Sequence, residues 1–152
     1  MSSWAEFEMG APDLAAAARR LLAQHGLAYL GTVRPDGGPR VHPVAPVLTD
    51  AHLLVAIGDW SPKWRDLRRD PRCILHLLPG PADDEVVMGC RATERSELFE
   101  VASAAASHTI HADDHVIELE IDRFDHGWWE RVGQPDTAPI RYRWTAAEGV
   151  IR

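Results

Sequence analysis

Apolar residues recur at helical spacing near the start of the chain. Between residues 14 and 25 they fall on one face, and Gly26 then stands where a helix C-cap is expected. The residues of this face are Leu14, Ala18, Leu21 and Leu22. The pattern therefore predicts a helix over residues 14–25. Residues 1–11 form a short lead whose Trp4 and Phe7 are expected to dock on the body or on a partner subunit.

Short segments of alternating or continuous apolar residues follow, and turn residues separate them. They predict strands over residues 27–33, 40–47, 52–57, 73–78, 85–94, 115–121 and 140–144. Tight turns join the first three strands, which predicts an antiparallel meander. Gly89, inside the fifth strand, predicts a bulge where the sheet bends.

The segments between these strands read as loops and short helices. A polar loop is expected at residues 79–84, and Ser96 is expected to cap an alanine-rich helix that runs to about residue 107. Residues 122–137, which contain Trp128 and Trp129, show no regular pattern and are expected to be irregular.

No repeat or linker divides the chain, so we expect one domain over residues 1–152. Many short strands with two or three helices indicate a mainly β (α+β) fold, a six- to seven-stranded antiparallel β-barrel with flanking helices. Its parts would be a lead and helix over 1–26, a barrel core over 27–94, and a helix with the last strands over 95–152.

A basic stretch lies between the third and fourth strands. Five of the sixteen Lys and Arg residues fall within residues 61–72. Ser61 is a candidate N-cap, Pro62 suits the first helical position, and Asp70 precedes a proline that ends the helix. Free backbone N–H groups at this helix start, together with Lys63, would favour an anion such as phosphate. The alternative is a short solvated helix whose basic face binds nothing, and the stretch alone leaves both interpretations open.

Composition and net charge argue against several classes of function. The net charge of −7 and the pI near 5.5 argue against nucleic-acid binding, which needs a broad basic surface. No segment has the roughly 20 apolar residues of a membrane span, and no signal peptide is recognisable. Cys73 and Cys90 fit no metal or disulfide spacing, so they read as buried free thiols. We expect a cytoplasmic protein without a membrane partner.

The histidines suggest one further kind of site. His108, His111 and His115 surround two aspartates, which is compatible with a metal site, but a solvated loop is the simpler interpretation and no metal ligands are predicted. No nucleophile and base stand in a recognisable arrangement, so no catalytic side chain is predicted either.

Three blocks in this order resemble the pyridoxamine 5'-phosphate oxidase-like, FMN-binding split β-barrel family. They are residues 30–43 (strand, turn, strand), residues 61–72 with the strand that follows, and residues 89–94. The resemblance implies a homodimer with two equivalent cofactor sites between the subunits. The implied cofactor is FMN, with a deazaflavin (coenzyme F-420) as the alternative, while some relatives bind haem.

The resemblance also implies the residues of the cofactor site. Lys63 would contact the phosphate, helped by Ser61 and Arg40, with Arg65 as a weaker candidate. The others implied are Val55, Ala56 and Ile57, whose backbone would line the flat ring, Thr32 and His42, which would reach the ring or substrate, and Trp129, which would come from the other subunit. The chain departs from the family pattern in having Pro62 where active oxidases have arginine, and Asp66 where asparagine is frequent.

Two functions follow from this resemblance. The first is an oxidoreductase that transfers hydride to or from a small organic substrate, with the chemistry done by the cofactor ring. The second is a non-catalytic carrier or sensor that holds a flavin or haem on the same barrel. The loss of the arginine at Pro62 favours the second.

Overall fold

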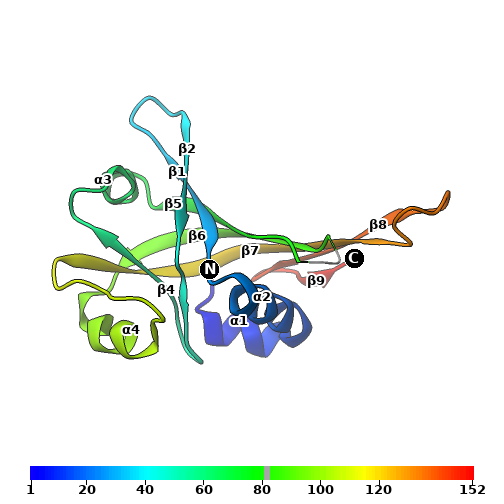
Figure 1. The fold of residues 1–152 in the computed structure, drawn as a ribbon, viewed down its shortest axis with the longest axis horizontal. Helices are drawn as coiled ribbons and strands as arrows, with labels where there is room; N and C mark the ends of the chain where they lie inside the picture. The colour runs from blue at the N-terminus through cyan, green and yellow to red at the C-terminus, as the bar shows by residue number, and fades with distance from the viewer. Residues whose placement is uncertain (81–82) are drawn as a thin grey trace.

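The structure is a computed structural model that describes residues 1–80 and 83–152. The fold is an antiparallel sheet of nine strands in the described residues, strongly curved into a split barrel, with helices packed around it (Figure 1). This confirms the predicted class. Residues 81 and 82, part of the predicted loop at 79–84, lie outside the described residues.

The strands are close to the predicted ones at the start of the chain and longer at its end. They are β1 (Ala28–Val33), β2 (Pro39–Val44), β3 (Val47–Leu48), β4 (Leu53–Gly58), β5 (Arg72–Leu77), β6 (Glu85–Glu94), β7 (Asp114–Glu130), β8 (Ala138–Thr145) and β9 (Gly149–Ile151). Their order is β2-β1-β5-β6-β7-β4-β3, and β8 pairs with both β7 and β9.

The predicted meander of the first three strands is wrong. β2 pairs with β1, but β4 pairs with β7, from Leu54 opposite Glu118 to Gly58 opposite Asp114. The physical reason is burial. Four of the six β4 residues are buried, so this strand belongs inside the barrel, whereas the prolines of β2 suit the edge of a sheet.

The second correction concerns residues 122–137. β7 continues through Trp128 and Trp129 to Glu130, because β6 and then β8 supply hydrogen-bonding partners along this length. The result is a long arm of β7 and β8 that extends away from the barrel (Figure 1). The predicted bulge is confirmed, since the register of β6 against β7 shifts between Gly89 and Cys90.

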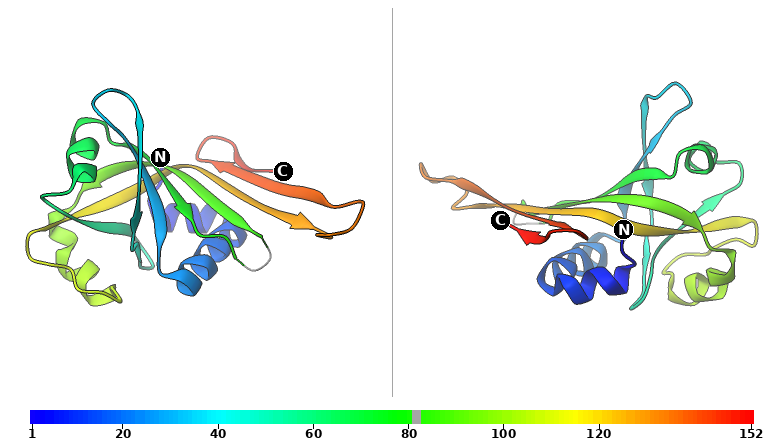
Figure 2. Two further views of the ribbon diagram at one scale, coloured as in Figure 1. Left: turned by 45° about the horizontal axis from the view of Figure 1, so that its top comes forward. Right: turned by 180° about the vertical axis from the view of Figure 1, so that it is seen from behind.

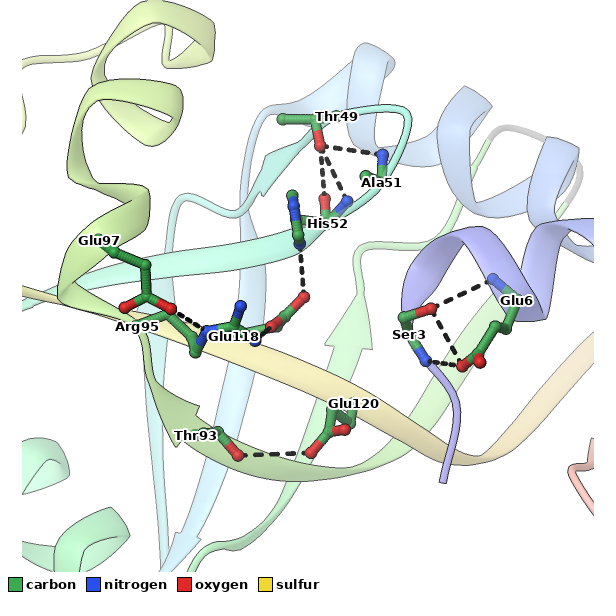
Figure 3. A network of polar contacts seen from close by, with 10 residues as sticks. All are labelled: Ser3, Glu6, Thr49, Ala51, His52, Thr93, Arg95, Glu97, Glu118 and Glu120. Carbon is green, nitrogen blue, oxygen red and sulfur yellow. Dashed lines mark hydrogen bonds and ion pairs between the residues drawn. The ribbon is translucent and has the colours of Figure 1, made fainter.

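The helices are α1 (Trp4–Gly10), α2 (Pro12–His25), α3 (Pro62–Arg69) and α4 (Phe99–Ala105), preceded by a 3-10 turn, η1 (Ser96–Leu98). The lead is therefore helical rather than irregular, because Ser3 and Glu6 form a capping box (Figure 3). Ser96 does not cap α4; it lies inside the 3-10 turn, and α4 begins only at Phe99.

One core fills the barrel and continues under α1 and α2. Trp4 and Phe7 are fully buried in it, so the lead docks on the body. Phe7 stacks on Phe124 with ring centres 4.7 Å apart, and its edge meets Trp144. Figure 2 shows α1 and α2 side by side against the same side of the sheet. Within the described residues, none of the helices has the length and apolar character that crossing a membrane requires.

The buried carboxylate of Glu118 joins segments on both sides of β7. Glu118 of β7 lies 2.6 Å from His52 Nδ1 and accepts a hydrogen bond from Arg95 Nη1 at 2.5 Å (Figure 3). Arg95 also donates to Glu97, at 2.5 Å. This network ties the start of β4 and the 3-10 turn to β7, at a distance from α3.

Candidate functional site: a split in the barrel beside α3

The barrel is open between β2 and residues 55–58 of β4. On one edge of β4, residues 54–58 pair with β7, but on the other edge only Leu53 and Leu54 pair, with β3. The second edge of residues 55–58 therefore has no strand partner in the described part of the chain. α3 follows directly after β4 and contacts β1 and β4 at this opening (Figures 1 and 2).

Asp66 holds α3 against the β1–β2 hairpin. Thr32 and Arg40 are cross-strand partners, and both point at this carboxylate. Thr32 Oγ1 donates to Asp66 Oδ2 at 2.9 Å, and Arg40 Nε donates to the same oxygen at 2.6 Å. Arg69, one turn further along α3, lies 3.7 Å from Asp66 and donates to the carbonyl of Val33. The helix is thus fixed to the sheet by buried polar bonds.

This network changes the roles expected for two residues. Thr32 is buried and its hydroxyl donates its hydrogen bond to Asp66, so this hydroxyl is not available as a donor to a ligand at the opening. Arg40 lies at the opening, but its charge is balanced by Asp66. In the sequence, Asp66 stands out only as a departure from the family pattern. It is instead the residue that positions both neighbours, a role with no local sequence signal.

Three cations of α3, Lys63, Arg65 and Arg68, have no ion pair in the described residues, and Lys63 is the one of these that is half-buried. Among residues 1–80 and 83–152 no carboxylate lies within ion-pair distance of its ammonium. Burial without a partner lowers the pKa of Lys63. A phosphate bound beside the ammonium would stabilise its charged form and raise the pKa again.

Ser61 offers a second unused group beside it. Its side chain is buried, yet its hydroxyl has no hydrogen-bond partner. The expectation that this hydroxyl caps α3 is wrong, because the backbone carbonyl of Ser61 takes the bond from Trp64 N at 3.1 Å, while the side chain makes no cap hydrogen bond. A buried hydroxyl without a partner is costly, so this one fits a site that a ligand completes.

The three residues of β4 expected to line a flat ring divide into two kinds. The side chains of Val55 and Ile57 are buried in the barrel core, whereas Ala56 faces the other side and is half-buried. Only Ala56 and the unpaired backbone edge are therefore open to a ligand. This agrees with a contact through backbone groups.

The remaining predicted residues are less closely grouped. His42 lies half-buried on the same face of β2 as Arg40. Arg65 is exposed and donates to the carbonyl of Trp60 at 3.3 Å. Trp129 lies on the arm, at the far end of the sheet from α3, so this chain does not bring it to the opening (Figure 1).

The outer face of β1, β2 and β5 carries an apolar hollow of about 610 Å³. Tyr29, Val41 and Ile74 line it and are strongly exposed, Val41 to 61%. Apolar patches of this kind on one face frequently mark an interaction surface. Elsewhere in the described residues, no three His, Cys, Asp or Glu side chains lie close enough together to hold a metal ion.

A family model described as pyridoxamine 5'-phosphate oxidase matches residues 14–126, which include β1 to β6, α3 and much of β7. Comparison with curated proteins gives no match.

Several solved structures share the fold. An FMN-binding protein related to pyridoxamine 5'-phosphate oxidase, from Nostoc punctiforme, is 14% identical with a TM-score of 0.66, and the match covers 91% of this chain and 94% of that one. A haem-binding protein from Mycobacterium smegmatis is 21% identical with a TM-score of 0.64, over 85% of this chain and 58% of that one. An F-420 reductase is 17% identical with a TM-score of 0.56, over 70% and 94%.

These three structures support the fold alone, because their sequences are distant. The chain spans only 58% of the length of the haem-binding protein. The family model, by contrast, covers most of the sequence and the whole opening beside α3. On this basis the chain belongs to the pyridoxamine 5'-phosphate oxidase family.

Proposed function

We propose that this chain binds FMN, or the deazaflavin coenzyme F-420, with its phosphate between Lys63 and Ser61. The observation that carries the proposal is the pair of unused groups there: a half-buried ammonium without a carboxylate, and a buried hydroxyl without a partner. Both lie at the start of α3, an eight-residue helix whose first N–H groups favour an anion. A phosphate would satisfy all of them at once.

The ring of the cofactor would lie along the unpaired edge of β4. The backbone of residues 55–58 supplies N–H and C=O groups there, and Ala56 is small enough to let a flat ring approach. Arg40, held by Asp66, borders the opening from β2. When bound, a flavin or deazaflavin supplies hydride chemistry; this chain's residues bind it, orient it and exclude water. The proposed activity is oxidation or reduction of a small organic substrate.

We further propose that the protein is a homodimer. The apolar hollow on β1, β2 and β5 would be covered by a second copy, and the arm would carry Trp128 and Trp129 to the partner's site. Aromatic residues are enriched at such interfaces. The two buried free thiols, Cys73 and Cys90, suit a reducing compartment, and we propose the cytoplasm.

A second candidate function is a carrier or sensor that holds a flavin or haem without turnover. The observation that favours it is the shortage of free cations at the opening. Arg40 is balanced by Asp66, Arg65 is turned toward Trp60, and Pro62 replaces the arginine of active oxidases. Reduction of the bound cofactor by a nicotinamide or a reduced deazaflavin would support the enzyme over the carrier or sensor.

The first experiment is an absorbance spectrum of the purified protein, followed by titration with FMN, coenzyme F-420 and haem. The variant Lys63→Met keeps the apolar stem but removes the charge, and it should weaken FMN binding about tenfold or more while leaving riboflavin binding unchanged. Arg91→Met, at an exposed arginine of β6, is the matched control for loss of one positive charge. Equal FMN affinity in all three proteins would refute the site.

The chain offers an independent readout because Lys63 is its single lysine. An amine-selective acylating reagent should modify only Lys63 and the N-terminal amine. The lowered pKa of Lys63 increases the fraction of neutral, reactive amine at any given pH. We expect FMN to protect Lys63 from the reagent and riboflavin, which lacks the phosphate, to leave it accessible. Mass spectrometry of the peptide that contains Lys63 measures this directly, whether or not the protein is an enzyme.

A further inference from the structure

His115, near the start of β7, is held on both sides by carboxylates from other segments. Its Nδ1 lies 2.8 Å from Glu94 Oε1 at the end of β6, and its Nε2 lies 3.2 Å from Asp59 Oδ1 in the turn after β4. Its ring also stacks on Trp64 of α3, with centres 3.9 Å apart and planes 17° apart. These contacts join four segments that are distant in the sequence.

Only a protonated imidazole donates from both nitrogens. A neutral ring would have a single donor for the two carboxylates. Burial disfavours the charged ring, but the hydrogen bonds to Glu94 and Asp59 outweigh it, and the pKa of His115 is raised from its usual 6.5. Arg68 is also near, with its guanidinium carbon 5.6 Å from the centre of the Trp64 ring, and Asp113 and Asp114 line one pocket together with His115. Asp114 is engaged by the backbone N–H of His111.

The contacts of His115 fall on both ends of the segment that carries the proposed phosphate ligands. Asp59 stands two residues before Ser61, and Trp64 directly follows Lys63. The backbone of this segment has few other anchors: Ser61 N donates to the Gly58 carbonyl, and Trp64 N donates to the Ser61 carbonyl. Beside the burial of Trp64 in the core, the contacts of His115 therefore connect the segment to β6 and β7.

We propose that protonated His115 is a positioning residue that clamps residues 59–64 in the geometry in which Ser61 and Lys63 bind the cofactor phosphate. The inference rests on the phosphate site proposed above. Because the folded protein holds the ring proton more tightly than the unfolded chain, the clamp is complete below about pH 6.5 and is lost as the pH rises through the raised pKa. Phosphate affinity should follow the same course.

The test compares FMN with riboflavin at about pH 6 and at about pH 8.5, across the titration range of histidine. In His115→Gln, FMN affinity at the lower pH should fall about fivefold. The pH profile of FMN affinity should also lose the contribution that comes from titration of the His115 ring. Riboflavin affinity should not change. Ionisation of the phosphate and of Lys63 is common to both proteins, so the difference between their pH profiles isolates His115. A purely structural role would weaken both ligands equally.

Two further variants protect the test from loss of folding. Asp59→Asn keeps an acceptor but removes the negative charge of one clamp partner, a side chain that is 75% exposed, and it should reproduce a part of the His115→Gln effect. His108→Gln changes an exposed histidine in the loop before β7 and is the control. The ring pKa of His115, measured by NMR in the free protein, should drop in Asp59→Asn.

The outcomes separate the two proposals. If the wild-type protein binds FMN no more tightly than riboflavin, the phosphate site is absent and both proposals fall. If wild type prefers FMN and His115→Gln keeps the same preference and pH profile, only the clamp is wrong. A preference that shrinks in His115→Gln and Asp59→Asn, but not in His108→Gln, supports the clamp.

Discussion

Replacing Asp66 with alanine should destabilise the protein strongly, because this carboxylate is the single buried partner of two groups. Asp66 and Thr32 are each only 2% exposed. The hydroxyl of Thr32 donates to Asp66 at 2.9 Å and Arg40 donates at 2.6 Å. Alanine leaves both donors without an acceptor, in a place that water does not reach freely.

The magnitude follows from these contacts. A buried hydroxyl left without a partner costs about 1–3 kcal/mol, and loss of a charge-assisted bond costs about 1.5–3 kcal/mol. The Arg40 side chain is 25% exposed, so water replaces a part of its lost bond. The pair with Arg69, at 3.7 Å and more exposed, adds little. We expect the free energy of unfolding to fall by about 3 kcal/mol, which is roughly 6–12 °C in Tm for a chain of this size.

Urea unfolding at one protein concentration measures this loss. Asp50→Ala is the control, because Asp50 also faces an arginine, Arg19 at 3.8 Å, but is fully exposed; it should leave the stability nearly unchanged. Asp66→Asn keeps an acceptor for Thr32 and should lose less than Asp66→Ala. A loss below about 1 kcal/mol in Asp66→Ala would refute the reasoning, since it would mean that water satisfies both donors.

Two further predictions concern the thiols and the outer face of the barrel. Burial raises the pKa of Cys73 to about 12 and that of Cys90 well above its usual range, so a thiolate-selective reagent at about pH 8 should label neither thiol until urea unfolds the protein; rapid labelling of the folded protein would contradict their burial. Val41→Asp should convert the proposed dimer to a monomer in size-exclusion chromatography, whereas Val101→Asp, at an exposed valine of α4, should not. A wild-type protein that is monomeric at micromolar concentration would be evidence against the dimer.

Much of the local structure follows from the sequence. The helical stripe predicts α2, with Gly26 in the left-handed conformation at its end, and Pro62 and Asp70 mark the limits of α3. The strands β1, β5 and β6 were predicted to within about a residue at each end, because period-2 burial and flanking turn residues are local signals. The order of the three sequence blocks was sufficient to indicate the family, which the family model confirms.

The sequence by itself therefore determined α2 and α3, most of the strands, and the position of Lys63 and Ser61 at a helix start. Only the tertiary structure decided that β4 pairs with β7, that β7 continues as an arm, and that Asp66 faces Thr32 and Arg40. It also decided that His115 meets Asp59 and Glu94. The physical reason is that the β4–β7 pairs and the contacts of Asp66 and His115 join residues 21 to 64 positions apart. They depend on strand register and on which faces are buried together, and no local pattern encodes either.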